Sequence, residues 1–258
     1  MNLTKRRDAG MATTGTALVT GSTRGIGRAI ALRLARDGFR VAINYARDRS
    51  SGERMLSEMR AVRDDALLLQ ADVGTAEGCD RLVREAIGRL GRLDLLVNNV
   101  GPFQEMPLAE TDDATWRRMI DGNLGSAFWC ARAALPAMRA GGGSIINIGA
   151  LNAEVSPGMT HEAPAYFVAK SALAMLTKSM ARTEGPNRIR VNAVSPGFIE
   201  TEGYAEWDAA EKARWRSQIP LGRFGRPEEV AEAVSFLASE KAAYISGTVL
   251  HVHGGLWI

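Results

Sequence analysis

Two residues in the second half of the chain, Tyr166 and Lys170, have the types and the spacing for proton transfer. They lie four residues apart in a stretch, 164–183, that the sequence predicts to be helical, so one turn puts both side chains on one face. A free phenol has a pKa of about 10 and stays protonated at neutral pH. A cation one turn away favours the phenolate, so the pair predicts a phenol whose pKa is lowered. Tyrosine and lysine at this spacing also occur on solvated helices, so the rest of the chain decides between the two interpretations.

A second candidate site lies near the start of the chain, where an apolar run over 16–20 ends in a glycine-rich turn. Ile26, Ile30 and Leu34 follow at helical spacing, which predicts a strand, a tight turn and a helix. Glycines have no Cβ, so backbone amides can approach a pyrophosphate at the positive end of a helix. The sequence therefore predicts a dinucleotide site formed by Gly21, Ser22, Thr23, Arg24, Gly25, Ile26 and Gly27.

The end of the second predicted strand, over 40–45, bears on the choice of cofactor. Folds that bind NAD place a carboxylate there to hold the ribose hydroxyls, but this chain has Tyr45, followed by Arg47 and Arg49. Since no carboxylate at the strand end repels a 2′-phosphate, and Arg24 and Arg47 can reach one, the sequence favours NADP(H) over NAD(H). The alternative is that these arginines are solvated loop charges.

Strands and helices alternate along the chain, and this alternation must position both sites. Apolar runs predict strands over 16–20, 40–45, 66–70, 93–97, 143–148, 190–194 and 248–252. The pattern predicts a doubly wound α/β domain of Rossmann type, with a seven-stranded parallel sheet and helices on both faces. Ligands in such folds bind at the carboxyl ends of the strands, which is where the candidate residues fall.

Length and composition indicate one catalytic domain over 16–258, preceded by a disordered leader over 1–15. The chain has 258 residues and is 46% hydrophobic, enough for a full core. The net charge of +3 is matched by the leader residues Lys5, Arg6 and Arg7. The body shows no basic stripe with interleaved aromatics, which argues against nucleic acid as a partner.

The chain also lacks the features of a membrane, secreted or metal-binding protein. No apolar run approaches the roughly 18 residues needed to cross a bilayer. Cys79 and Cys130 show neither a disulfide framework nor the spacing of metal ligands, and we expect them to be packing residues. His251 and His253 share one face of the last predicted strand, but a metal site needs a third ligand. We expect a cytoplasmic protein without a bound metal.

Taken together, the motifs resemble the short-chain dehydrogenase/reductase family, and in style its 3-oxoacyl-carrier-protein reductase-like members. The resemblance covers residues 16–258. Besides the glycine turn and the Tyr166/Lys170 pair, it rests on motifs in the family's order and approximate spacing: Asp72-Val73, Asn98-Asn99-Val100-Gly101, Asn123 and Pro196-Gly197.

The resemblance implies a role for each matching residue. Tyr166 would protonate the oxygen of a carbonyl that receives hydride, Lys170 would hold the nicotinamide ribose and favour phenolate, and Asn123 would hold a water that links Lys170 to solvent. Beyond the glycine turn and the catalytic pair, the residues implied to contact NADP(H) are Tyr45, Arg47, Asp72, Val73, Asn98, Asn99, Gly101, Pro196, Gly197, Ile199 and Thr201. The family also implies a homotetramer.

One position departs from the family pattern. The family has a serine donor two residues after the Asn-Ile of the fifth strand, but here Asn147-Ile148-Gly149 is followed by Ala150, which has no donor. Losing one such donor costs about 2.7–4 kcal/mol. Asn152 or Ser156 could replace it. We expect the small-molecule substrate to meet Ala150, Asn152 and Phe103.

The departure leaves two alternatives to a carbonyl reductase. Pteridine reductase-like members also lack the serine and reduce C=N bonds, and a nucleotide-binding regulator would need no donor at all. Two further stretches bear on the site. The segment 198–219 carries Tyr204, Trp207 and Trp215 and is either a lid over substrate or a surface helix with incidental aromatics. The apolar end, Leu256-Trp257-Ile258, predicts burial against another subunit.

Overall fold

The computed structural model describes residues 15–151 and 162–256 of the chain. Within these ranges seven strands pair in parallel to form one sheet, in the order β3-β2-β1-β4-β5-β6-β7. The predicted doubly wound sheet is therefore confirmed. The strands are β1 (Gly15–Val19), β2 (Phe39–Tyr45), β3 (Leu67–Gln70), β4 (Leu95–Asn98), β5 (Gly143–Ile148), β6 (Ile189–Pro196) and β7 (Val249–Val252).

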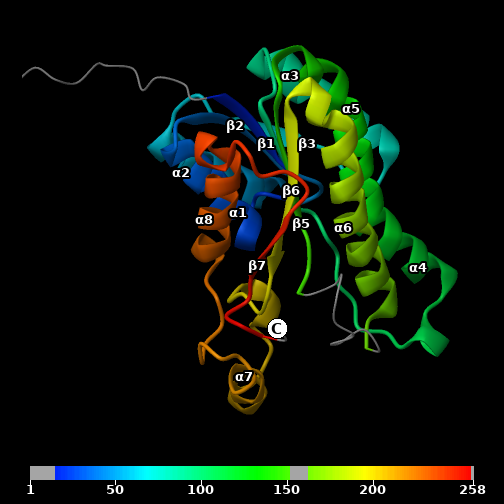
Figure 1. Cartoon of the computed structure of the whole chain (residues 1–258). Helices are drawn as coiled ribbons and strands as arrows, with labels where there is room; N and C mark the ends of the chain where they lie inside the picture. The colour runs from blue at the N-terminus through cyan, green and yellow to red at the C-terminus, as the bar shows by residue number, and fades with distance from the viewer. Residues whose placement is uncertain (1–14, 152–161, 257–258) are drawn as a thin grey trace, which may run out of the picture.

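Helices cover both faces of the sheet (Figure 1). One face carries α1 (Gly25–Arg36), α2 (Arg49–Val62) and α8 (Pro227–Ala238). The other carries α3 (Ala76–Leu90), α5 (Ser126–Gly141) and α6 (Pro164–Glu184), with α4 (Asp113–Ile120) leading into α5. The short helix α7 (Ala209–Arg216) lies below the sheet in Figure 1, near the carboxyl end of the chain.

Successive strand residues point into two different hydrophobic clusters. Val19, Val97 and Ile146 pack with apolar residues of α1 and α8, whereas their neighbours Leu96 and Ile145 pack with α3 and α5. Because both faces of the sheet are covered, the strands are apolar at nearly every position. That is why the sequence shows continuous apolar runs rather than an alternating pattern.

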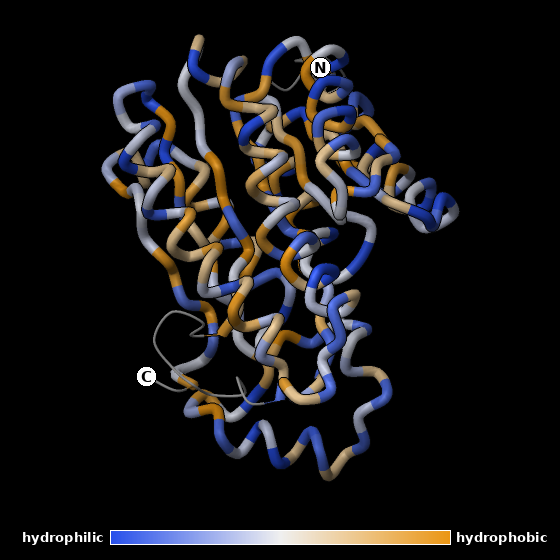
Figure 2. The backbone as a smooth tube through the Cα atoms, turned by 90° about the vertical axis from the view of Figure 1, so that its right-hand side faces the viewer, coloured by the Kyte–Doolittle hydropathy of each residue, from blue (hydrophilic) through white to orange (hydrophobic). Residues whose placement is uncertain are grey.

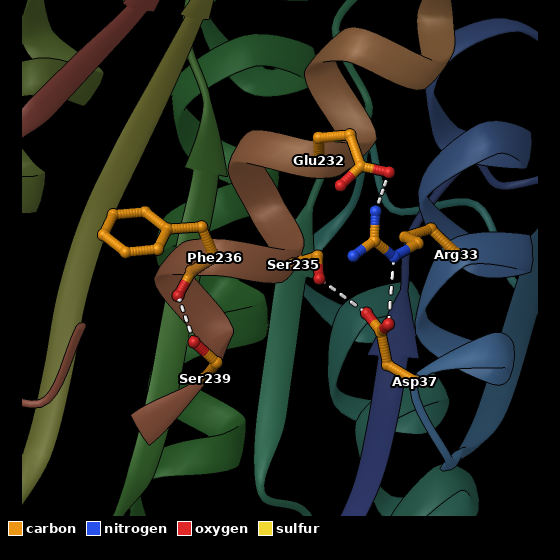
Figure 3. Close-up of polar contacts among 6 residues, drawn as sticks. All are labelled: Arg33, Asp37, Glu232, Ser235, Phe236 and Ser239. Carbon is orange, nitrogen blue, oxygen red and sulfur yellow. Dashed lines mark hydrogen bonds and ion pairs between the residues drawn. The ribbon is translucent and has the colours of Figure 1, made fainter. Parts of the chain in front are cut away.

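Polar contacts fix α8 against α1 (Figure 3). Asp37, at the end of α1, accepts hydrogen bonds from Arg33 Nε at 2.9 Å and from Ser235 Oγ at 2.6 Å. Arg33 also pairs with Glu232 of α8. At the end of α8, the Ser239 hydroxyl donates to the Phe236 carbonyl at 2.8 Å. These contacts join the carboxyl end of α1, the end away from the glycine turn, to α8.

The two cysteines are buried in the helical layer between α3 and α5, as predicted for packing residues. Cys79 Sγ donates to the Val73 carbonyl at 3.3 Å. A side-chain hydrogen bond with Cys79, reinforced by burial, raises the pKa of the Cys130 thiol. Among the residues that the structure describes, no helix is long and apolar enough to cross a membrane.

The ends of the chain correct two expectations. Gly15, predicted to close the leader, is the first residue of β1, and residues 1–14 lie outside the described part. Leu256 is 1% exposed within its own chain, so the predicted burial of this residue by another subunit is wrong. Trp257 and Ile258 lie outside the described residues.

The face formed by α4, α5 and α6 carries exposed apolar side chains. Figure 2 views the molecule from that side and colours hydrophobic residues orange. We call this set the α4–α6 patch: Trp116 (39% exposed), Phe128 (43%), Val168 (49%) and Met175 (64%). A hollow of about 440 Å³ beside Phe128 is lined by Ile120, Leu124 and Leu176 among others. The patch is a candidate contact surface.

Candidate functional site

Tyr166 and Lys170 lie side by side on α6, as their spacing predicts. Pro164 is the first residue of this helix, a position where its missing N–H costs nothing. Lys170 is only 2% exposed, and its Nζ donates to the Ile148 carbonyl at the end of β5 at 2.8 Å. The same Nζ lies 5.8 Å from the centroid of the Tyr166 ring. The lysine is therefore fixed between α6 and the end of β5.

The electrostatics of this pair differ from the expectation. Burial raises the pKa of the Tyr166 phenol, with a smaller contribution from Tyr204, and burial lowers the pKa of Lys170 to about 8. The predicted lowering of the phenol pKa by Lys170 is therefore wrong, because loss of water around the phenolate outweighs the neighbouring cation. The phenol is protonated at neutral pH, which is the form that can donate a proton.

Asn123 reaches the same place from a π-helical turn, Asp121–Gly125, between α4 and α5. Such turns often occur at functional sites. Its Nδ2 donates to the Pro102 carbonyl at 2.8 Å and to the Met119 carbonyl at 3.0 Å. Its Oδ1 is buried and has no hydrogen-bond partner within the described chain. An acceptor in this state is ready for a polar ligand or a water.

Gly101 lets Asn123 and Lys170 face one another. A Cβ at this position would lie 2.7 Å from Asn123 Oδ1 and 2.8 Å from Lys170 Nζ, so any larger residue would push into both groups. The sequence analysis assigned Gly101 to the cofactor, and the structure adds this second reason for a glycine. Tyr166, Lys170, Asn123 and Gly101 thus form one group at the carboxyl end of the sheet.

Ala150 lies in an apolar cluster next to this group, at the position where the family has its serine. We call this the carboxyl-end cluster, and its buried members are Ala150, Ala163, Phe167, Phe198, Ile219, Phe224 and Leu256. The buried Ser195 hydroxyl, which the sequence analysis missed, donates to the Ala150 carbonyl. Asn152 and Ser156 lie outside the described residues.

Aromatic rings surround Tyr166. Phe103, predicted to meet the substrate, is 51% exposed and packs edge-on against Tyr166, with ring centroids 4.9 Å apart. Tyr204, Trp207 and Trp215 pack against the carboxyl-end cluster. The aromatics of 198–219 are therefore not incidental to a surface helix, because they attach this segment to the site.

Conformation and close packing explain the glycines of the first turn. Gly21 and Gly25 have φ of +58° and +52°, which side chains disfavour. A Cβ on Gly27 would lie 2.4 Å from the Gly21 carbonyl oxygen. The turn leads directly into the start of α1, where the helix dipole favours an anion. These features fit a dinucleotide pyrophosphate.

Buried polar side chains hold the turn in shape. Ser22 is fully buried. Its hydroxyl donates to the Val19 carbonyl and accepts from the backbone N–H of Asn44, both at 2.9 Å. Asn99 Nδ2 donates to the Thr20 and Gly21 carbonyls, each at 3.0 Å. The sequence analysis missed Asn44, whose Oδ1 accepts from the Gly21 amide at 3.1 Å. An asparagine inside an apolar strand was the available signal.

The predicted adenosine side has exposed cations beyond β1 and β2. Arg24 is exposed and has no ion-pair partner in the described chain, and the Arg47 side chain is 91% exposed and 3.9 Å from Asp72. Tyr45 is buried at the end of β2. The sequence analysis did not weigh Asp48, which caps α2. Hydrogen bonds from Ser51 and Ser50 lower the pKa of Asp48 to about 2, so this carboxylate is engaged by its own helix.

Other predicted cofactor residues have side chains turned into the protein. Asn98 donates to Asn147 at 2.9 Å, and Val73 and Ile199 are 3% exposed. A Cβ on Gly197 would meet His253 at 2.7 Å, so that glycine allows β6 and β7 to approach. Any contact of Val73, Gly197 or Ile199 with a cofactor would come from the backbone.

Thr201 differs from its neighbours Pro196 and Ile199, because it faces the glycine turn. Its Cγ2 lies 3.5 Å from the position that a Cβ on Gly25 would take. The segment after β6 therefore closes one side of the predicted groove. His251 and His253 have ring centroids 5.1 Å apart, and the described residues contain no group of three or more potential metal ligands.

Comparison with known proteins gives one consistent result. Residues 21–257 match a protein family described as enoyl-(acyl carrier protein) reductase. The chain is 40% identical over 250 residues to the 3-oxoacyl-[acyl-carrier-protein] reductase FabG of Staphylococcus aureus, covering 96% of this chain and 100% of that protein. It is 37% identical over 243 residues to a 3-oxoacyl-[acyl-carrier-protein] reductase of Synechocystis sp., covering 93% and 96%.

Solved structures agree with the sequence relatives. A double mutant of a Serratia marcescens short-chain dehydrogenase/reductase superposes with a TM-score of 0.90 at 36% identity, covering 96% of this chain and 100% of that chain. A blue fluorescent protein from a metagenomic library, solved in complex with NADPH, gives a TM-score of 0.89 at 33% identity, with coverage of 96% and 100%. The similarity therefore extends over the sheet and over both candidate sites.

Proposed function

Because this chain belongs to the short-chain dehydrogenase/reductase family, we propose that it is an NADPH-dependent reductase of a carbonyl group in a small molecule. The observation that carries the proposal is the meeting of Tyr166, Lys170 and Asn123 beside Gly101. Reduced nicotinamide, when bound, supplies hydride to the carbonyl carbon. The chain's own residues supply the proton and the positioning.

Tyr166 is the proton donor of the proposed reaction. As the carbonyl carbon gains hydride, the π electron pair moves to the oxygen, which takes the proton from the Tyr166 hydroxyl. The products are an alcohol and a phenolate, and the phenolate is reprotonated through Lys170. A lysine with a pKa of about 8 exchanges protons readily near neutral pH. The unpartnered Asn123 Oδ1 supports a water at the end of this relay.

Two sets of residues would hold the cofactor. Gly21, Gly25 and Gly27 leave room for the pyrophosphate at the start of α1. Arg24 and Arg47 would pair with the 2′-phosphate, which supports NADPH over NADH. The NADPH complex of a structural relative points the same way.

A second candidate, reduction of a C=N bond, is favoured by Ala150. A protonated imine already carries its proton and builds up no oxyanion, so a site without the usual donor penalises it less. Ala150 offers no side-chain donor to a developing oxyanion, and this is the feature that favours such a substrate, a reduced pterin among them. A regulator that binds the nucleotide without chemistry is the third possibility.

NADPH oxidation across a substrate panel separates these candidates. The panel contains 3-oxoacyl thioesters, as suggested by the names of the relatives, together with simple ketones, cyclic imines and a dihydropterin. We expect ketone or thioester turnover that falls at least a hundredfold in Tyr166→Phe. Turnover of imines alone would favour the second candidate. Tight NADPH binding with no turnover on any member would leave the regulator.

We also propose that the chain forms a homotetramer and resides in the cytoplasm. The α4–α6 patch supports the first proposal, because apolar side chains gathered on one face are costly to leave in water. The buried free thiols of Cys79 and Cys130 support a reducing compartment.

A further inference from the structure

We propose that Tyr204 donates the hydrogen bond to the substrate oxygen that Ala150 cannot donate. This inference rests on the proposed reductase function and assigns one more catalytic residue to the same site. Tyr204 ends a 3₁₀ turn, Glu202–Tyr204, in the segment after β6. The usual donor position follows β5, so the replacement would come from a different strand end.

The carboxyl-end cluster brings the three relevant residues together. Ala150 is one of its buried members, and Tyr166 and Tyr204 both pack against it while remaining partly exposed. A donor for the substrate oxygen must lie beside the proton donor and open to the same space. The observation that supports the first condition is that Tyr204 and Tyr166 pack against the same cluster.

Neighbouring rings fix the orientation of Tyr204. Its centroid lies 4.6 Å from that of Trp207, 5.8 Å from that of Phe224 and 5.9 Å from that of Phe198. The phenol ring is therefore held on several sides, and its hydroxyl has a preset direction. A preset donor avoids reorganisation during the reaction, which is the basis of this kind of stabilisation.

The Tyr204 hydroxyl is available to a ligand. Within the described chain neither Tyr166 nor Tyr204 has a hydrogen-bond partner for its hydroxyl. Tyrosines with largely buried rings usually find a partner for this group. By contrast, the Ser195 hydroxyl is engaged by the Ala150 carbonyl and is unavailable.

The electrostatics agree with a donor role. Burial, with a smaller effect of Glu105, raises the pKa of Tyr204 to about 12, so its phenol keeps its proton across the neutral range. Tyr204 in turn makes a smaller contribution than burial to the raised pKa of Tyr166, so the two phenols lie close enough to interact electrostatically. In the proposed arrangement Tyr166 transfers its proton, whereas Tyr204 only hydrogen-bonds to the oxygen.

Tyr204→Phe tests this assignment, because it removes the hydroxyl and keeps the ring. We expect kcat to fall about a hundredfold with KM changed less than threefold and an unchanged unfolding midpoint. Tyr244→Phe is the matched control, since Tyr244 is fully exposed, and it should keep wild-type kinetics. Adding Ala150→Ser to Tyr204→Phe should restore kcat at least tenfold.

A binding measurement provides a readout besides turnover. Quenching of tryptophan fluorescence, to which Trp207 beside Tyr204 contributes, reports the affinity for an alcohol product. Tyr204→Phe should weaken this affinity several-fold, and Tyr244→Phe should not. If the wild type turns over, an undiminished kcat in Tyr204→Phe overturns the Tyr204 assignment and leaves the proposed function standing. A variant in which KM alone changes has the same consequence. Absence of wild-type turnover on the whole panel overturns the proposed function and this assignment with it.

Discussion

At the scale of single residues, burial decides the protonation of the site. Tyr166 stays protonated because its surroundings exclude water, and the same surroundings lower the pKa of Lys170 to about 8. The acid of the proposed reaction is thus already in the form that reduction requires. Burial destabilises the charged form of Lys170, because its ammonium exchanges water for a single hydrogen bond, to the Ile148 carbonyl.

The lowered pKa of Lys170 should make the free energy of unfolding depend on pH, and replacing this lysine should remove that dependence. The pKa of Lys170 falls from 10.5 to about 8 on folding, so between these values the unfolded chain binds more protons. The free energy of unfolding of the wild type therefore rises with pH across this window, by about 3 kcal/mol in all. In Lys170→Met that rise should disappear, and at pH 7 the variant should be about 2 kcal/mol more stable despite the lost hydrogen bond.

Urea unfolding between pH 7 and 9.5 measures both effects. The range stops below the pH at which tyrosines of the unfolded chain ionise, because the raised pKa values of Tyr166 and Tyr204 lower stability only above that point. Lys178→Met, at an exposed position of α6, is the control and should keep the wild-type slope. A Lys170→Met protein with the wild-type slope would contradict the buried-ammonium account.

The two arginines beyond β1 and β2 should determine the choice of nucleotide. We expect Arg24→Ala and Arg47→Ala each to raise the Kd for NADPH about tenfold, because each removes a charged hydrogen bond to the 2′-phosphate. The Kd for NADH should change less than twofold. Titration of nucleotide fluorescence gives both constants. Arg49→Ala is the control, since Arg49 pairs with Glu53. Equal losses of affinity for NADPH and NADH in Arg24→Ala or Arg47→Ala would contradict the assignment of these arginines to the 2′-phosphate.

The sequence predicted those residues of the site that lie close together along the chain. Tyr166 and Lys170 are one helical turn apart, and the glycines of the first turn are close together in the chain, so spacing alone places them. Tyr204, Ser195 and Asn44 could not be found in this way, because their contacts join segments distant in the chain. The direction of the Tyr166 pKa shift was missed for the same reason, since burial depends on the packing of those segments.

At the scale of elements, polar contacts join the carboxyl end of α1 to α8. Asp37 receives hydrogen bonds from both helices, through Arg33 and Ser235. The strands could be predicted because covered parallel strands are apolar throughout. The π-helical turn Asp121–Gly125 could not, since the apolar pattern of the surrounding helices runs through it without a break.

Asp37→Ala should loosen this contact. We expect the free energy of unfolding to fall by about 1–2 kcal/mol, because Arg33 and Ser235 lose a partly buried partner. Asp64→Ala, at an exposed loop position, should change stability by less than about 0.5 kcal/mol. Chemical denaturation of the two variants makes the comparison. Equal stability of both would show that apolar packing alone joins α1 to α8.

At the scale of the whole molecule, the α4–α6 patch is the feature that the monomer leaves unexplained. Its exposed apolar side chains come from α4, α5 and α6, three helices on the same side of the sheet. The sequence analysis placed a subunit contact at Leu256-Trp257-Ile258. Leu256 instead belongs to the chain's own core, and the other two residues lie outside the described part. Sequence alone could not distinguish these cases, because both positions are apolar and only the packing shows which one is covered.

Phe128→Glu should disrupt the proposed tetramer. The substitution replaces an apolar ring of the patch by a carboxylate that can pair with Arg132, whose guanidinium lies 5.4 Å from the Phe128 ring centroid. Burying this charged group in an apolar contact is costly, so we expect a smaller species by light scattering with size-exclusion chromatography. Leu221→Glu, at an exposed apolar position outside the patch, should retain the wild-type mass. A wild-type mass equal to one chain, or an unchanged mass in Phe128→Glu, would rule out the patch as the interface.

The position of Leu256 has a consequence for how the two phenols are held. This residue, 1% exposed, belongs to the same cluster as Ala150 and supports the surroundings of Tyr166 and Tyr204. Shortening this one side chain would therefore leave the pairing of the seven strands intact and still remove apolar contacts from the surroundings of both phenols.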